Sequence, residues 1–453
     1  MFSPQFSVLP GNLNIAVQQG MLKRRFESAL RAELGYRDAA IRVPFMEKIG
    51  TTITRTRPGR LPRITTPINP ATNVPLDNGL PQNQTQLEQY TTTVELWAGA
   101  VDPLCLADNE TAIASLFLLN QTNLGEQAMR SLNGIVLKRL LDAYLNGQTV
   151  VDATLGAPAA AVHVNDIRGF QTVILNGVPT PTSAAATMPV TFNDGGTFTT
   201  YTLIGAVADI VNVSTAQEVG GISGTLTFSG NVTVANGTAG NAVVGAYSPT
   251  IIRPNGRAAT EDLTSGDILK FSHIRAAVTA LSNNAIPRIN GYYNCYLSPE
   301  SINQLFEDQE FQILYRGTEL NGSKEYDQMI LIKGLGVRFI RTNEPPIQNL
   351  NNMIIQRPFV CGEGVAIEDR FDAGMNSIIS RQSGAYPALY NIDVADDIRM
   401  IVRGQIDQLA LFINQAWSYI AGWAVPTDST INSSVIRTAN NSYYKRGVFI
   451  ETA

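Results

Sequence analysis

NLGEQAMRSLNGIVLKRLLDAYLNG, residues 123–147, is the segment with the clearest structural pattern in this sequence. Its apolar residues recur every three or four positions, which places them on one face of a helix: Leu124, Ala128, Leu132, Ile135, Val136, Leu140 and Tyr144. Gly147 is positioned to end that helix. A helix of about 24 residues is about 36 Å long. The sequence therefore predicts one long helix, preceded by a shorter helical piece at residues 109–119.

The chain before this helix has two different patterns. Residues 12–35 predict an amphipathic helix, because Leu22, Phe26, Leu30 and Leu34 recur every four positions. Residues 50–100 are rich in Thr, Pro and Asn, alternate like strands in their outer parts, and have turn signals in the middle. This pattern predicts a long two-stranded excursion. Two strands alone are only marginally stable, so we expect the excursion to lie on another surface.

The chain after the long helix begins with a β-rich region. Residues 155–258 contain short β-type runs, MPVTF, FTTYTLI, GTLTFSG, NVTVANG and NAVVGAY, separated by Gly, Asn and Ser turns. This pattern is typical of a small all-β barrel or sandwich. No Lys or Arg occurs between Arg168 and Arg253, so this region has a different surface from the rest of the chain. Residues 261–425 mix helical and strand patterns, and SYYKRGVFIE near the end predicts one more strand.

The composition places the chain among ordinary globular proteins. It has 453 residues, 44% hydrophobic and 16% charged, which suggests about three domains with a sizeable core. The net charge of -5 means that any contact with DNA must come from a local patch. The start has no signal-peptide pattern and no apolar run is long enough to cross a membrane, so we expect no membrane contact. Three widely spaced cysteines predict neither a disulfide framework nor a structural zinc site.

Motifs for catalysis are weak. The two histidines, His163 and His273, lie in no recognisable motif, and no phosphate-binding loop or nucleophile elbow is present. Acidic pairs such as Glu368-Asp369 and Asp396-Asp397 are expected to be solvated in loops. We therefore expect a protein that is not an enzyme, with no cofactor, no metal and no catalytic residues.

The basic feature of the sequence is a group of four arginines in the excursion: Arg55, Arg57, Arg60 and Arg63. Arginine suits phosphate contact and also bidentate pairing with carboxylates of a partner protein. A solvated charged arm is the third interpretation. Prolines at positions 58 and 62 stiffen the strand, and this favours a protein partner.

Three stretches of the sequence carry a family resemblance. LGEQA at 124–128 is similar to the start of the spine helix in one branch of the Hong Kong 97-type bacteriophage capsid fold. TSGDIL at 264–269, followed by NNAIP at 283–287, is similar to the opening of the axial domain in that family. GYYNCYLSPE at 291–300, followed by GLGVRFI at 334–340, resembles its central strand-helix-strand core. The order of the elements over residues 12–425 also resembles these coat proteins.

This resemblance implies an α+β chain with a defined domain order. The expected parts are an N-terminal arm with its amphipathic helix (1–45), an extended loop with flanking peripheral-domain strands (46–100), a peripheral domain with the spine helix (101–154), an inserted β-barrel or sandwich (155–258), an axial domain (259–390), and a return to the peripheral domain with a C-terminal tail (391–453). The basic fold lacks such an insertion, but some short-tailed phage coats carry one. Because the insertion is almost bare of Lys and Arg, we expect it on the outer surface of the shell, away from DNA.

The resemblance also implies a structural role and a set of partners. The chain would be the major capsid protein of a tailed double-stranded DNA phage, assembled in the host bacterial cytoplasm into hexamers and pentamers of the virion head. The expected partners are scaffolding protein, a portal protein, a decoration protein where one is present, and packaged DNA through weak local contacts.

Two sets of inter-subunit contacts follow from the resemblance. The extended loop of this family reaches over the next subunit, so Arg55, Arg57, Arg60 and Arg63 are expected to pair with carboxylates there, with Glu110 and Glu126 as candidates. The arm is expected to contact a neighbour through Leu22, Phe26 and Leu30.

Two rival interpretations remain. An encapsulin-type nanocompartment shell protein would use the same fold, but the insertion and the chain length argue against it. A β-rich carbohydrate-active enzyme or adhesin would use residues 155–258 as its working domain. That segment has only Asp194, Asp209 and Glu218 as acidic residues between Arg168 and Arg253, and no Trp to stack a sugar.

Overall fold

The computed structural model describes residues 35–45, 52–58, 87–105, 110–175, 178–209, 221–257, 259–312, 330–331, 336–350, 353–371, 389–393, 398–403, 412–426, 428–429, 443–444 and 446–453. The chain divides into two compact units, each built from separate stretches of sequence. The first unit comprises residues 1–53, 92–137 and 367–424, and the second comprises 54–91, 138–366 and 425–453. Helices and strands occur together, so the chain is α+β, as the sequence predicts.

The first unit contains a six-stranded sheet built around its longest strand, β23 (Phe412–Ala424). The strand order is β1-β20-β23-β22-β21, and β4 also pairs with β23. The bounds of these other strands are β1 (Ala40–Phe45), β4 (Glu95–Cys105), β20 (Ala366–Phe371), β21 (Leu389–Asp393) and β22 (Arg399–Arg403). Successive side chains of a strand point to opposite faces, and every second residue of β23 from Gln415 to Trp423 is buried.

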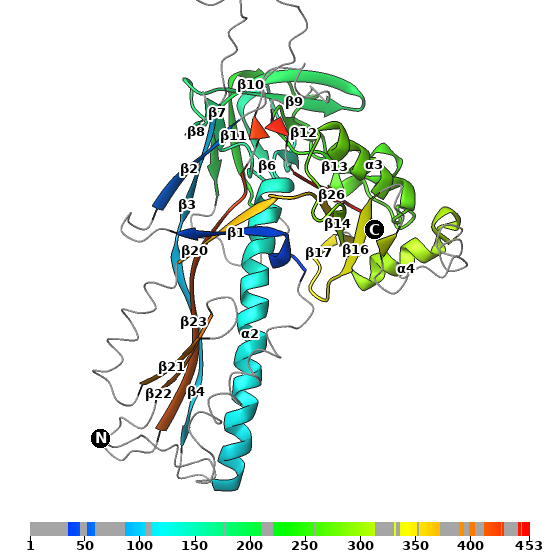
Figure 1. The fold of residues 1–453 in the computed structure, drawn as a ribbon. Helices are drawn as coiled ribbons and strands as arrows, with labels where there is room; N and C mark the ends of the chain where they lie inside the picture. The colour runs from blue at the N-terminus through cyan, green and yellow to red at the C-terminus, as the bar shows by residue number, and fades with distance from the viewer. Residues whose placement is uncertain are drawn as a thin grey trace, which may run out of the picture. The chain divides into compact units, whose positions relative to one another are not determined.

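Helix α2 (Glu110–Tyr144) is one continuous helix of 35 residues. The sequence predicted two pieces, but residues 120–122 contain neither Pro nor Gly, so nothing breaks the helix between them. The predicted apolar face is confirmed: every one of its residues is buried except Ile135, which is partly buried. Figure 1 shows α2 beside β4 and β23, and Trp417 Nε1 on β23 donates a hydrogen bond to Gln127 Oε1 on α2 at 3.1 Å.

The second unit contains a small β-barrel. Its strand order is β5-β12-β9-β10-β11-β6, with bounds β5 (Gln148–Val150), β6 (Ala159–Val164), β9 (Met188–Asp194), β10 (Thr197–Ala208), β11 (Gly224–Val232) and β12 (Ala242–Gly245). A bridge between Val151 and Val164 joins the two edges, so the sheet closes on itself. The interior is apolar and includes Val162, Phe192 and Phe228. The predicted NVTVANG strand is wrong, because β11 ends at Val232 and turns follow.

A second six-stranded sheet in this unit has the order β13-β26-β19-β14-β16-β15. Its strands are β13 (Ile251–Ile252), β14 (Tyr293–Leu297), β15 (Ile330–Leu331), β16 (Val337–Arg341), β19 (Phe359–Cys361) and β26 (Gly447–Ile450). Helices α3 (Phe271–Asn283) and α4 (Pro299–Glu307) belong to the same region, and α3 shares an apolar core with the sheet. All five residues of β14 are buried, which confirms the predicted buried strand.

The remaining described strands form two-stranded ribbons. They are β2 (Thr52–Pro58) with β3 (Leu87–Thr93), β7 (Thr172–Leu175) with β8 (Val178–Pro181), β17 (Ile347–Leu350) with β18 (Met353–Gln356), and β24 (Asp428–Ser429) with β25 (Tyr443–Tyr444). Short 3-10 helices occupy Arg37–Ala39, Pro254–Gly256 and Thr260–Asp262.

Candidate assembly interfaces

The ribbon of β2 and β3 is the predicted excursion. Among the strands that the structure describes, these two pair only with each other. Arg55 and Arg57 lie on the half-buried face of β2, whereas Thr52, Thr54 and Thr56 are exposed on the other face. Both arginines already interact within the chain. A contact with a neighbouring copy would therefore be made in addition to these interactions or in place of them.

The other predicted contact residues are only partly covered by the structure. Glu126 is exposed on α2, and Glu110 is the first residue of the same helix, although its side chain lies outside the described part. Arg60, Arg63, Leu22, Phe26 and Leu30 all lie outside the described residues. The predicted pairing of these arginines with Glu110 or Glu126 therefore stays a prediction.

A buried charged cluster holds the end of the arm to the first unit. Arg37 Nη2 donates to Glu368 Oε1 at 2.9 Å, and the two side chains are 6% and 0% exposed. Tyr419 donates its hydroxyl proton to the same carboxylate, and the Arg37 guanidinium lies 5.2 Å from the centre of the Tyr419 ring. Next to Arg37, the backbone N–H of Tyr36 donates to Asn133 Oδ1 of α2 at 3.1 Å. The end of the arm is thus fixed to β20, β23 and α2.

This cluster corrects one expectation from the sequence. The Glu368-Asp369 pair was predicted to be a solvated loop pair, but both residues lie in β20 and are 0% exposed. Arg37 and Glu368 are 331 positions apart in the sequence, so no local pattern indicates that they meet. Burial first, and then the Glu368 carboxylate, raise the pKa of Tyr419, which keeps its phenol protonated as a donor.

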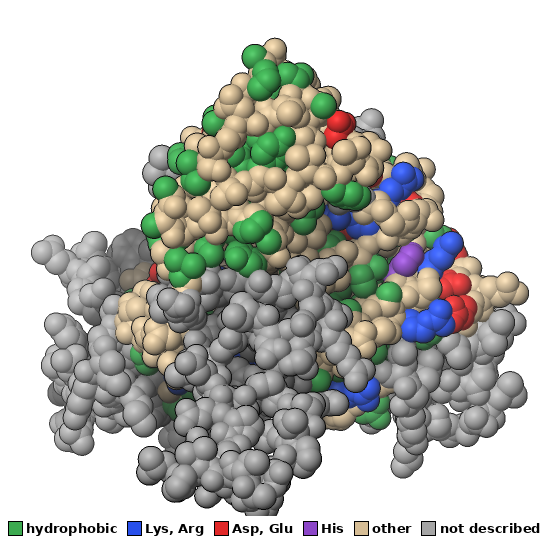
Figure 2. Space-filling view, turned by 90° about the horizontal axis from the view of Figure 1, so that it is seen from above, with side chains coloured by type: hydrophobic (Ala, Val, Ile, Leu, Met, Phe, Trp, Pro, Cys, Tyr) green, Lys and Arg blue, Asp and Glu red, His purple; other side chains and the backbone are tan. Residues whose placement is uncertain are grey.

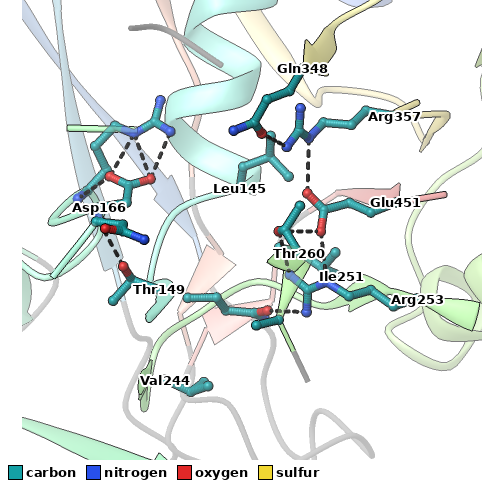
Figure 3. A pocket seen from close by; sticks show the side chains of 14 residues that line it. Leu145, Thr149, Asp166, Val244, Ile251, Arg253, Thr260, Gln348, Arg357 and Glu451 are labelled. Carbon is teal, nitrogen blue, oxygen red and sulfur yellow. Dashed lines mark hydrogen bonds and ion pairs between the residues drawn. The ribbon is translucent and has the colours of Figure 1, made fainter. Parts of the chain in front are cut away.

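A second buried cluster fixes the C-terminal strand of the second unit. Glu451 accepts a hydrogen bond from Arg253 Nε at 2.8 Å, from Arg357 Nε at 3.0 Å, and from Thr260 Oγ1 at 2.8 Å. We call Arg253, Arg357 and Glu451 the Glu451 triad. Figure 3 shows the three charged groups converging with Thr260 at one side of a small cavity. Burial alone would raise the pKa of Glu451, but Arg253 and Arg357 outweigh that effect and lower the pKa to about 2.

The cavity beside the triad has a volume of about 60 Å³, and Arg168 and Asp166 also line it. Figure 3 shows Asp166 on the side away from Glu451. Arg168 is paired with Asp166 at 2.8 Å and with Asp142 at 3.1 Å. Counting these groups with the triad, three arginines face three carboxylates, so the charges balance. The arrangement therefore stabilises the fold, and it offers no net charge to attract an ionic ligand.

The barrel presents an almost uncharged surface. Exposed apolar side chains stand on it at Phe198 (72% exposed), Val207 (67%) and Val234 (37%). Figure 2 looks down on the molecule from above and shows apolar side chains scattered among uncharged polar ones, with charged groups confined to small areas. A surface of this kind lacks the cationic groups that DNA phosphates require.

His163 bridges two aspartates at the edge of the barrel. Its Nδ1 lies 2.9 Å from Asp152 Oδ2, and its Nε2 lies 2.7 Å from Asp209 Oδ2. The hydrogen bond with Asp209 raises the pKa of His163 and outweighs the opposing effect of its partial burial. His163 therefore joins the loop after β5 to the residue that follows β10.

The other candidates for chemistry also have structural roles. His273 Nδ1 accepts a hydrogen bond from the backbone N–H of Lys270 at the start of α3, and burial lowers its pKa. Cys295 and Cys361 are buried free thiols whose pKa is raised by burial. Within the described ranges, no group of His, Cys, Asp and Glu could hold a metal ion. In the same part of the chain, no helix has the length and apolar character needed to cross a membrane.

Neither a protein-family model nor a curated protein matches the sequence. Among solved structures, the capsid of Ralstonia phage GP4 is 12% identical with a TM-score of 0.47, over 91% of this chain and 87% of that chain. The capsid of cyanophage P-SCSP1u is 10% identical with a TM-score of 0.43, over 92% and 88% of the two chains. The cyanophage Pam1 capsid is 11% identical with a TM-score of 0.43, over 99% of this chain and 96% of that chain. All three are capsid structures of phages.

Proposed function

We propose that this chain is the major capsid protein of a tailed double-stranded DNA bacteriophage, a structural subunit of the icosahedral head. The observation that carries the proposal is the β2–β3 ribbon, an extended element whose strands pair only with each other among the described strands. Two strands alone are marginally stable, so a ribbon of this kind needs a further surface. A shell supplies that surface in every copy, through repeated heterologous contacts between subunits.

Two further features support the proposal. The end of the arm is fixed to the body of the subunit by the Arg37–Glu368 pair. A shell subunit needs such an anchor, because a contact made by the arm must transmit force to the body of the subunit. The 35-residue helix α2 matches the long spine helix that the sequence resemblance implies.

The finer organisation is part of the same proposal. The barrel of β5, β6 and β9–β12 would be the insertion, facing outward, because residues 169–252 contain no Lys or Arg to meet the packaged genome. Arg55, Arg57, Arg60 and Arg63 would lie over a neighbouring copy. Scaffolding protein, a portal protein and a decoration protein would be the other partners, with hexamers and pentamers as the assembly units.

Co-expression of the chain with its scaffolding protein tests the proposal. We expect closed shells of uniform size in negative-stain electron micrographs. Chain that stays monomeric in the presence of scaffold would contradict the proposal. Shells that enclose a cargo enzyme and never package DNA would instead support the nanocompartment alternative.

A further inference from the structure

An apolar groove lies between α4 and the β17–β18 hairpin of the second unit. Its volume is about 550 Å³, which is within the range of pockets that hold a sizeable apolar ligand. The apolar side chains that line it are Pro299, Pro345, Ile347, Met353 and Ile354. Among the lining residues that the structure describes, Glu300 has the only ionisable side chain, and none of them is Lys or Arg.

The hairpin register explains why this groove is apolar and open. Ile347 pairs with Gln356, and Asn349 pairs with Ile354, so these four side chains share one face of the ribbon. Ile347 is 48% exposed and Ile354 is 52% exposed. On the opposite face Ile355 is completely buried. The hairpin therefore leaves Ile347 and Ile354 exposed on one face, where Gln356 is buried, and Met353 reaches the groove from the other face.

The sequence contains a segment of matching chemistry. Leu22, Phe26 and Leu30 are spaced four residues apart, which would place them on one stripe of a helix. Residues 21–34 contain four basic and two acidic side chains, a net charge of 4 − 2 = +2. An amphipathic helix commonly binds by laying such a stripe into an apolar groove. Its positive charge is complementary to a groove whose only ionisable group is a carboxylate.

We propose that the groove receives the Leu22, Phe26 and Leu30 stripe from a second copy of this chain. The inference rests on the proposed shell function and names the surface on which the arm docks. A segment on one copy and a groove on the next make a heterologous contact, which repeats around a ring of subunits. The arm, anchored through Arg37, would then tie each subunit to its neighbour.

A binding measurement tests the docking without any need for shells. A fluorescent peptide of residues 19–34 is titrated with the purified unassembled full-length chain, and anisotropy reports binding. We expect saturable binding that Ile354→Asp weakens about tenfold or more, because the substitution places a charge in the apolar contact. Phe198→Asp is the matched control, since Phe198 is also an exposed strand residue but lies outside the groove. No binding, or equal loss in both variants, would overturn the proposal.

Disulfide cross-linking identifies the copy that supplies the segment. Two differently tagged chains, one with Phe26→Cys and one with Ile354→Cys, are co-expressed with Cys105 replaced by Ser in both. We expect a cross-linked pair of chains, and none when Phe198→Cys replaces Ile354→Cys. A disulfide that forms only when both new cysteines are in the same chain would overturn docking by a second copy. Wild-type shells that form while neither peptide nor cross-link is detected would overturn the groove proposal and leave the shell function standing. Peptide binding by a chain that forms no shells would support the groove proposal and overturn the shell function.

Discussion

Replacing Glu451 by Gln should destabilise the second unit strongly. Its two arginine partners are 5% and 3% exposed, so the substitution leaves two buried cations without their carboxylate. The pKa of Glu451 is lowered from 4.5 to about 2. A difference of one pKa unit corresponds to about 1.4 kcal/mol of free energy. The ionised carboxylate therefore contributes about 3 kcal/mol to the free energy of unfolding. Removing one partner of a buried ion pair costs about 3–5 kcal/mol, which agrees.

The measurement is urea unfolding of the unassembled chain, followed by fluorescence and circular dichroism. Glu310→Gln is the matched control, because Glu310 pairs with Arg275 at 2.7 Å but both side chains are about half exposed. An exposed pair of this kind contributes about 0–1 kcal/mol. Because the pKa of Glu451 is lowered by folding, its contribution should be complete above pH 4.5 and lost as the pH falls toward 2. If Glu451→Gln costs no more than Glu310→Gln at neutral pH, the reasoning is wrong.

Three further outcomes are expected. Replacing Arg55 and Arg57 together by Ala should lower the melting temperature of the assembled shell more than that of the free subunit, and added salt should narrow the difference, because salt screens the ion pairs that only the wild type makes; equal losses would place both arginines in the subunit's own fold. His163→Gln should destabilise the barrel more at about pH 6 than at about pH 9. Folding raises the pKa of His163 above its unfolded value of 6.5, so its contribution to stability is present below pH 6.5 and is lost as the pH rises through the folded pKa. Equal effects of the substitution at both pH values in thermal melts would contradict this. Arg37→Ala should destabilise the first unit by more than about 1 kcal/mol in urea unfolding, because it removes the nearer of the two cations beside the buried Glu368 carboxylate and leaves only Arg42, at 3.9 Å, and the Tyr419 hydroxyl; a loss no larger than that of an exposed pair, about 0–1 kcal/mol, would refute it.

Sequence reasoning identified the elements whose pattern is local. The long helix was predicted because its apolar face repeats at the helical period, and the face is buried as expected from Leu124 to Tyr144. The barrel strands were predicted by alternation and by their Gly and Asn turns, with the exception of NVTVANG. The buried strand β14 was predicted from the segment GYYNCYLSP. Each of these signals lies within one continuous segment of the sequence.

Features that depend on distant partners were not predictable. The C-terminal tail was expected to form a strand, but its place inside a sheet, parallel to β13 and antiparallel to β19, depends on pairings about 90 to 200 residues away in the chain. The burial of Glu368 and Glu451 was missed for the same reason. A carboxylate is buried only when its cations are assembled around it, and nothing next to either residue in the sequence indicates those cations.

The structure of a single chain does not test the predicted contact residues. Arg55, Arg57 and Glu126 lie on described elements, but a contact between copies can be seen only when copies are assembled. Their predicted role depends on the family resemblance and on the chemistry of arginine, so it stays a prediction.

Cryo-electron microscopy of particles assembled from this chain and its scaffold tests the central claim most directly. The account predicts a closed icosahedral shell of hexamers and pentamers, with the barrel of β5, β6 and β9–β12 on the outer face and the β2–β3 ribbon lying across a neighbouring subunit. A particle whose shell is built from another protein, with this chain absent or present in a few copies, would contradict it.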